Sequence, residues 1–238
     1  MKIRIRFSKH DEMKFIGHLD VMRYFQKCIR RAHVDIKYST GFSPHQIMSF
    51  AQPLGLGITS DGEYMDIDVN STDTSENMIK RINSVSIPAI QIHSYRLLPE
   101  KSKTGMAVIA AADYEIRFRY PDKIKFDIRE VWTGFMSQEK IIITKETKSG
   151  VSDFDIKPFI FDNSLMEDCI FVRLSCGSVV NLKPETVMEA LFRFVGEELG
   201  EFDLLLHRKN MYALSDEDGS FIALEDMGTV IDSPLVEE

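Results

Sequence analysis

The first chemistry that the sequence suggests is the binding of an anionic partner. Residues 18–33 have apolar side chains at helical spacing, and the opposite side of this predicted helix carries four cations three or four positions apart: Arg23, Lys27, Arg30 and Arg31. A row of cations on one helix face suits phosphate groups. The alternative is a solvated face that acids elsewhere in the chain neutralise.

A Gly-Phe-Ser-Pro turn at residues 41–44 follows this helix. Lys37, Tyr38 and His45 flank the turn, and Phe42 lies within it. Cations, aromatic rings and free backbone N–H groups on one turn are the mixture used by sites for single-stranded RNA. We therefore expect the helix cations and Lys37 to hold phosphates, with Tyr38 or Phe42 stacking on a base and His45 adding a polar contact.

The histidines allow a second chemistry. If folding brings His18 and His45 together, the two imidazoles could act as acid and base on an RNA 2′-hydroxyl, although a structural hydrogen bond is the commoner role. His10, His18 and His45, with Asp20 or Glu63, have the side chains of metal ligands. Because no HxxxH or HxH spacing joins them, we expect no metal site.

The sequence also predicts no cofactor. The Gly-x-Gly of residues 55–57 lacks the third glycine of a dinucleotide fingerprint and precedes a strand where the fingerprint would open a helix. Cys28, Cys169 and Cys176 form no CxxC pair, so neither a disulfide framework nor a cysteine-built cluster is indicated.

The charge of the chain is unevenly distributed. The chain has 238 residues and a net charge of −8, but its first fifty residues contain ten Lys and Arg against four acids. Residues 215–238 carry eight acids and no Lys or Arg, which favours a solvated, partly disordered tail over a flap that competes for the basic face. Met1 opens directly onto an alternating strand without an apolar signal region, so we expect a cytoplasmic protein.

The hydrophobic pattern predicts an α+β fold with two ferredoxin-like (βαββαβ) domains in tandem. In the opening strand, Ile3, Ile5 and Phe7 alternate with cations that should face solvent. The first predicted domain continues with the helix at 18–33, two short strands, a strand at 63–69, a helix at 74–85 and a strand at 90–97. A similar order follows residues 99–112, a predicted connector. We expect domains at 1–99 and 113–210, with an acidic tail at 211–238.

Residues 14–69 resemble a protein family. Their Gly-His-Leu-Asp start, Arg-Arg-Ala helix end, Tyr-Ser-Thr-Gly-Phe turn, Pro-His pair and Leu-Gly-x-x-Ser-x-x-Glu segment are similar to the signature of the radical-SAM-linked proteins of DUF2344, a domain of unknown function. The segment KSGVSDFDIKPFI extends the resemblance through the second half. Gly17 stands where the family usually has Ser, and Lys157 replaces Arg, which loses bidentate anion geometry.

The resemblance implies a partner, because members of this family are typically fused to, or encoded beside, a radical SAM protein, often near RNA-processing genes. The chain lacks the CxxxCxxC triad that would hold the cluster, so the radical chemistry belongs to the partner. We therefore expect a non-catalytic accessory protein that presents tRNA, rRNA or another polyanion for modification. Two alternatives are a metal-independent endoribonuclease like the CRISPR RNA-processing proteins that pair two ferredoxin-like domains, using His18 or His45, and a protein scaffold.

Overall fold

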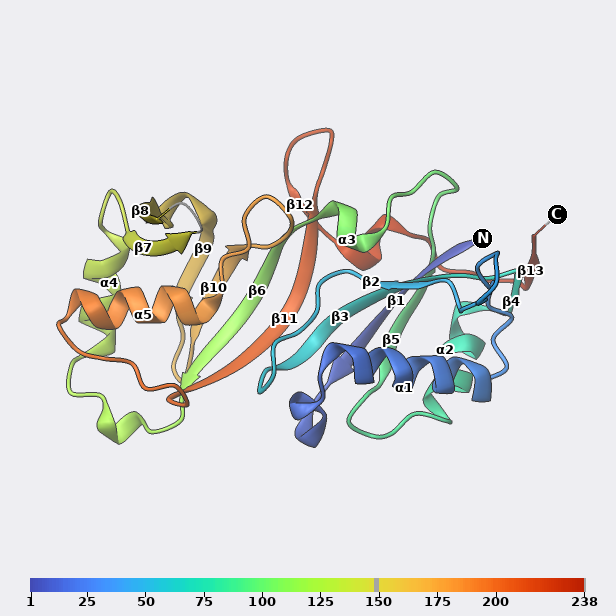
Figure 1. Cartoon of the computed structure of the whole chain (residues 1–238), viewed down its shortest axis with the longest axis horizontal. Helices are drawn as coiled ribbons and strands as arrows, with labels where there is room; N and C mark the ends of the chain where they lie inside the picture. Colours follow the sequence, from blue (N-terminus) through green and yellow to red (C-terminus); the bar gives the residue numbers. More distant parts are fainter. Residues whose placement is uncertain (148–149, 238) are drawn as a thin grey trace. The chain divides into compact units, whose positions relative to one another are not determined.

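The computed structural model describes residues 1–147 and 150–237, so Lys148, Ser149 and Glu238 lie outside the described residues. The chain forms two compact units (Figure 1). Unit 1 comprises Met1–Ala110 together with Arg208–Glu238, and unit 2 comprises Ala111–His207. The chain thus leaves unit 1 inside the predicted connector. It returns to unit 1 for its last segment, which we expected to be a separate tail.

The central sheet of unit 1 is antiparallel. Ile5 of strand β1 lies opposite Met65 of β3 on one side and Tyr95 of β5 on the other, while β2 pairs with the second edge of β3. Ile3, Ile5 and Phe7 are all buried, as their alternation predicts. The strands are β1 (Lys2–Lys9), β2 (Met48–Phe50), β3 (Thr59–Asp68) and β5 (Ile92–Leu97).

The prediction of a solvated second face is wrong for Arg4. Its side chain is 0% exposed, and its guanidinium donates to both carboxylate oxygens of Asp66 at 2.8 and 3.0 Å. A third bond, 3.1 Å long, reaches the carbonyl of Leu224, the first residue of the 3₁₀ helix η4 (Leu224–Met227). The C-terminal segment therefore covers part of the face that alternation alone assigns to solvent.

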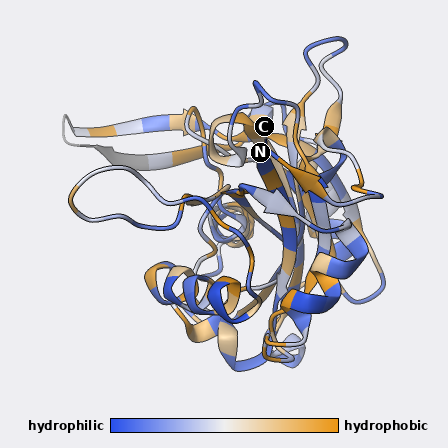
Figure 2. Cartoon of the chain, turned by 90° about the vertical axis from the view of Figure 1, so that its right-hand side faces the viewer, coloured by the Kyte–Doolittle hydropathy of each residue, from blue (hydrophilic) through white to orange (hydrophobic). Residues whose placement is uncertain are grey.

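Two helices cover the other face of this sheet (Figure 1). Helix α1 (His18–Arg31) buries Val21, Phe25, Cys28 and Ile29, and α2 (Ser75–Asn83) buries Met78 and Ile82. Hydrophilic and hydrophobic residues alternate along the helices in Figure 2, as amphipathic packing requires. Gly17 gives α1 no side-chain cap, whereas Thr74 caps α2 by accepting from the backbone N–H of Asn77.

The C-terminal segment is an ordered part of unit 1. Ile231 is buried, and its backbone N–H and carbonyl are both bonded to Ser75 at the start of α2. The expected partly disordered tail is thus replaced by packed structure, because apolar residues between the acids enter the core. Its elements are the end of β11 (Leu204–Leu214), β12 (Phe221–Ala223), η4 and β13 (Leu235–Val236), which pairs with β4 (Ser71–Thr72).

Unit 2 also mixes strands and helices, so the predicted α+β class is confirmed. In its sheet β10 lies between β6 and β9, with Val172 opposite Tyr114 and Asn163. A separate hairpin of β7 and β8 stands between the first helix and β9 in the chain. The elements are β6 (Ile109–Phe118), α4 (Ile128–Met136), β7 (Ile142–Thr147), β8 (Gly150–Asp155), β9 (Ile160–Leu165), β10 (Ile170–Ser175) and α5 (Pro184–Phe194).

Short helical segments connect these elements: η1 (Asp11–Phe15), α3 (Gly105–Val108), η2 (Pro121–Lys123) and η3 (Lys157–Phe159). None of the helices described in the structure combines the length and the apolar character needed to cross a bilayer.

Candidate functional site

The cationic face of α1 is the first part of the candidate site. The apolar stripe that includes Val21, Phe25 and Ile29 faces the core of unit 1, so the opposite side of the helix faces solvent. With 3.6 residues per turn, the predicted cations all fall on that exposed side. The cationic face consists of Arg23, Lys27, Arg30 and Arg31, each of which is exposed.

Two of these four cations, Arg23 and Arg31, have partners within the protein but can still bind a phosphate. Arg23 forms an ion pair of 3.1 Å with Asp20 on the same exposed surface, a contact worth at most about 1 kcal/mol. Arg31 donates to the backbone carbonyl of Val85 at 3.1 Å, which orients its guanidinium without neutralising the charge. A phosphate could therefore displace Asp20 at low cost and approach Arg31 directly.

Lys27 and Arg30 are the least neutralised members of the cationic face. Within residues 1–147 and 150–237, neither side chain forms an ion pair or a hydrogen bond with another group. Both cations are exposed in a chain whose net charge is −8. The alternative of a fully neutralised helix face therefore does not describe these two positions.

The aromatic loop, residues 38–45, is the second part of the site. Phe42 is 109% exposed and Tyr38 is 51% exposed, so both rings lie open to solvent. Gly41 has φ of +114°, a backbone conformation that a side chain would oppose. The predicted strands on either side of the loop are reduced to isolated bridges, such as Tyr38 with Gln46, and to the short β2.

Ser39 and His45 close the base of the aromatic loop. The backbone N–H of Ser39 donates to the carbonyl of His45 at 2.8 Å, and the Ser39 hydroxyl accepts from the His45 N–H at 3.1 Å. The same hydroxyl lies 2.8 Å from His45 Nδ1. His45 therefore has a structural role in the loop, and its exposed ring can still reach a ligand through Nε2.

The loop is attached to its surroundings at both ends. Gln46 donates to the carbonyl of Gln26 in the middle of α1 at 3.4 Å. Lys37, directly before the loop, is paired with Glu237, and this hydrogen bond raises the pKa of Lys37 and lowers that of Glu237. The predicted anion-binding Lys37 is thus neutralised by the C-terminal segment.

The two histidines proposed as an acid–base pair have different surroundings. His18 packs edge-on against Phe50, with ring centroids 5.2 Å apart, whereas His45 is held by Ser39. His18 begins α1 and Arg31 ends it, a separation of about 20 Å at 1.5 Å per residue. The predicted residues therefore spread along a surface, and His18 and Arg31 do not share one cleft.

Sequence reasoning missed a group of buried polar residues beside His18. Lys9, His18 and Glu63 line a small cavity of about 20 Å³, enough space for one water molecule. Glu63 accepts from Arg208 through both carboxylate oxygens, at 2.8 and 2.6 Å. Lys9 donates to the carbonyl of Ile16 at 2.9 Å, and burial lowers its pKa while Glu63 partly opposes that shift.

No local pattern could have found this group, because Arg208 lies 145 residues from Glu63. The sequence does contain one indication of buried pairing. Strands such as β1 and β3 carry charged side chains on the side that faces away from the apolar core, and these side chains must either face solvent or pair with opposite charges. In unit 1 the side chains of Glu63 and Arg208 are covered by other parts of the protein, so these two charges must be paired.

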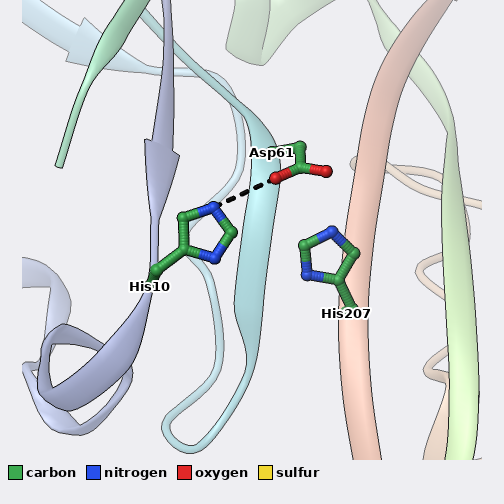
Figure 3. Close-up of side chains that lie close together, drawn as sticks. All are labelled: His10, Asp61 and His207. Atoms are coloured by element: carbon green, nitrogen blue, oxygen red, sulfur yellow. Dashed lines mark ion pairs between the residues drawn. The ribbon is translucent and has the colours of Figure 1, made fainter. Parts of the chain in front are cut away.

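His10 and Asp61 form a further ion pair in unit 1, with 3.0 Å between Nε2 and Oδ1 (Figure 3). Figure 3 draws this pair with His207, the last residue of unit 2. Among the residues that the structure describes, neither His18 nor His45 belongs to a group of three or more potential metal ligands.

Comparison with known proteins gives one family. Residues 2–184 match the family described as "Uncharacterized protein conserved in bacteria (DUF2344)". No curated protein matches the chain. Among solved structures, a chain of "Crystal Structure of a Cbf5-Nop10-Gar1 Complex" is similar, with a TM-score of 0.47 and 8% identity over 88% of this chain and 48% of that chain. This likeness is too low to support a conclusion about fold or function. The match over most of its length shows that the chain belongs to the DUF2344 family.

Proposed function

We propose that this protein binds RNA, a single-stranded part of a tRNA or rRNA, through the cationic face of α1 and the aromatic loop, and presents it to a radical SAM partner enzyme in the cytoplasm. The observation that carries the proposal is the exposure of Lys27 and Arg30 without a partner among the described residues. When such cations neutralise phosphates, the counterions condensed on the nucleic acid are released. This release is the main source of affinity for nucleic acids.

The aromatic loop supports RNA over other polyanions. A simple polyanion needs only positive charge, whereas single-stranded RNA also offers bases that stack on exposed rings. Phe42 and Tyr38 are such rings, and the Gln46 contact with Gln26 ties their loop to the same helix that carries the cations. Phosphate contacts would then position the strand, and stacking would hold its bases.

The geometry supports binding better than catalysis. An acid–base mechanism needs two groups that reach the same hydroxyl, within about 3 Å of it or through one water. The ring of His18 packs against Phe50 and Nδ1 of His45 lies 2.8 Å from the Ser39 hydroxyl, so both imidazoles make structural contacts. The radical chemistry implied by the family resemblance would be supplied by the partner enzyme.

We further infer that each unit has ferredoxin-like topology. In unit 1 the order of elements is β1, α1, β2, β3, α2, β5, and the strands lie in the order β5-β1-β3-β2. In unit 2 the order is β6, α4, β9, β10, α5 and the start of β11, with strands in the order β11-β6-β10-β9. Both follow the pattern of a split βαβ unit, and the hairpin β7–β8 is an insertion in the second.

RNA affinity measured against salt tests the proposed function. The probe is a fluorescently labelled single-stranded RNA of about 16 nucleotides and mixed sequence, titrated with the full chain at about 50 to 200 mM salt. With four phosphate contacts, the logarithm of the binding constant should fall against the logarithm of salt concentration with a slope of about −3. The double variant Lys27→Glu/Arg30→Glu should bind far more weakly, with a slope near −1.4.

The matched control is Lys101→Glu/Lys103→Glu, which makes the same charge change at two exposed positions between β5 and α3. This variant should retain most of the affinity. Equal losses in the two double variants, or a binding constant independent of salt, would overturn the proposal. Cleavage of the RNA that His45→Ala abolishes would favour the endoribonuclease instead. Partner binding that persists in high salt after nuclease treatment, without RNA affinity, would favour the scaffold.

A further inference from the structure

Unit 2 contains a cavity of about 480 Å³ that the proposed RNA interface does not use. It lies where several elements of the unit begin or end. Phe118 ends β6, Leu165 ends β9, Ile170 begins β10 and Ile128 begins α4, and all four line the cavity. Its volume lies within the range of about 300 to 1,000 Å³ that is usual for small-molecule sites.

The floor of the cavity is apolar and buried. Ile116 and Ile170 are 1% and 2% exposed, and the thiol of Cys169 beside them is desolvated, which raises its pKa. Met166 and Leu205 line the same cavity but are 45% and 38% exposed, so they form its rim. An apolar body that entered between these two side chains would cover exposed hydrophobic surface as well as fill the space.

Two sets of charged groups at the cavity are already bonded within the protein, one around Arg117 and one around Asp127. The guanidinium of Arg117 donates to Asp168 and to Glu115, each at 3.0 Å, and its pKa is raised mainly by the bond with Asp168. Asp127 caps α4, accepting from the backbone N–H groups of Arg129 and Glu130 at 2.8 and 3.2 Å. Neither group is left to bind a ligand, and the helix end is not open to an anion.

Arg129 is the cation that remains at this cavity. It is exposed, and among the described residues its side chain has no ion-pair or hydrogen-bond partner. A guanidinium presents a planar fork that matches the two oxygens of a carboxylate. Glu167 also lines the cavity and is exposed, so its carboxylate would repel a ligand that carries several negative charges.

We propose that this cavity is a binding site for a small molecule with an apolar or aromatic body and a single anionic group, a carboxylate or sulfonate that pairs with Arg129. The apolar body would lie on Ile116 and Ile170, between Met166 and Leu205. Arg129 would attract a single negative charge and Glu167 would repel further ones, so the site favours a monoanion. This ligand differs from the polyanion proposed for unit 1.

The experiment uses 8-anilinonaphthalene-1-sulfonate, an aromatic monoanion whose fluorescence rises in apolar sites, titrated into the full chain. Arg129→Glu should weaken its binding about tenfold, because a charge-assisted bond is lost and a repulsive charge is added. The control is Lys183→Glu, which also replaces an exposed cation at the start of a helix of unit 2, outside the cavity. This control should bind the dye as the unchanged protein does.

A second pair of variants tests the cavity itself. Leu205→Trp places a larger side chain at the rim and should abolish dye binding, whereas Leu214→Trp, at an exposed position on the same strand β11, should not. Cooperative thermal unfolding of every variant shows that the dye reports a folded protein.

Equal affinity in Arg129→Glu and Lys183→Glu would overturn the assignment of an anionic ligand. Retained dye binding in Leu205→Trp would overturn the site. The neutral dye Nile red is the remaining probe, and it should bind more weakly than the sulfonate. If it binds more tightly, and only Leu205→Trp affects it, the cavity takes an uncharged apolar molecule and the proposal is wrong in its chemical class.

Discussion

Glu237 is paired with Lys37, so a carboxylate near the end of the chain neutralises the cation that directly precedes the aromatic loop. The same carboxylate accepts from the N-terminal ammonium of Met1 at 2.7 Å. Strand β13, just before Glu237, holds this acid in place by pairing with β4. In the proposed function, an RNA that reached Lys37 would therefore have to compete with an acid of the protein itself.

Removing this acid should strengthen RNA binding. Glu237→Gln frees Lys37 and should raise the affinity two- to fivefold at low salt, the range that follows from about 0.5 to 1 kcal/mol for an exposed ion pair. The measurement is fluorescence anisotropy with single-stranded RNA. Glu100→Gln removes an exposed acid from the loop after β5 and is the matched control. An equal gain in both variants would mean that only net charge had changed.

Phe42→Ala should weaken RNA binding without destabilising the protein. Stacking of a base on an aromatic ring is worth about 1 to 3 kcal/mol, so the affinity should fall at least fivefold. Phe42 is fully exposed, which means that its removal leaves no cavity and the thermal midpoint should not change.

The control for Phe42 is Phe15→Ala, which removes another exposed ring of unit 1, on η1. If both variants lose affinity equally, or if neither does, the aromatic loop is not the stacking platform.

The buried pair of Glu63 and Arg208 should be essential for stability. Glu63→Gln leaves a buried guanidinium without its counter-charge and should cost about 3 to 5 kcal/mol in the free energy of unfolding. The double variant Glu63→Leu/Arg208→Met removes both charges and should cost less than the sum of the two single variants. Urea denaturation measures each value.

An exposed pair provides the comparison. Glu76→Gln breaks the pairing of Glu76 with Lys80 on α2, and because both groups face solvent the loss should be below about 1 kcal/mol. Additive losses at Glu63 and Arg208, or a loss as small as that at Glu76, would contradict the structural role of the buried pair.

Tyr95 should make the protein sensitive to alkali. Burial raises the pKa of its hydroxyl from 10.0 to about 12. The folded state thus keeps the proton at pH values where the unfolded chain releases it, so stability falls as the pH rises above 10. Relative to Tyr95→Phe, the unchanged protein should lose close to 2 kcal/mol by about pH 11.5.

The measurement is urea denaturation of both proteins at about pH 8 and about pH 11.5. Other groups titrate equally in the two proteins and cancel in the difference, although the variant also loses the bond between Tyr95 and Thr72 at both pH values. Parallel stability curves would show that Tyr95 does not titrate as its burial requires.

Local patterns were sufficient to predict the elements of the proposed RNA interface. Helical periodicity is a property of neighbouring residues, and the spacing of Leu19, Met22, Phe25, Ile29 and Ala32 predicts α1 and, by exclusion, its cationic face. The predicted apolar stripe is wrong at one end, because Leu19 is 61% exposed and Val21 and Cys28 are buried instead. The exposure of Phe42 follows from its position in a turn that glycine and proline punctuate.

Contacts between distant segments were not predictable in the same way. Arg4 alternates like a solvent-facing residue, yet segments around Lys103 and Leu224, 99 and 220 residues later, contact its guanidinium and bury it. The acids of residues 215–238 indicate disorder by composition, yet Ile231 enters the core beside Ser75. Burial of a charge depends on which segment covers it, and no periodicity within a single strand contains that information.

The division of unit 1 into two stretches of sequence has a consequence for how the chain folds on the ribosome. Unit 2 is continuous and can complete its fold as it emerges. Unit 1 completes its fold later, because Arg4 is synthesised 220 residues before Leu224 and gains the bond to its carbonyl only after Leu224 has left the exit tunnel. A nascent chain stalled before that point would hold an incomplete unit 1, in which Arg4 has its bonds to Asp66 but not the bond to the carbonyl of Leu224.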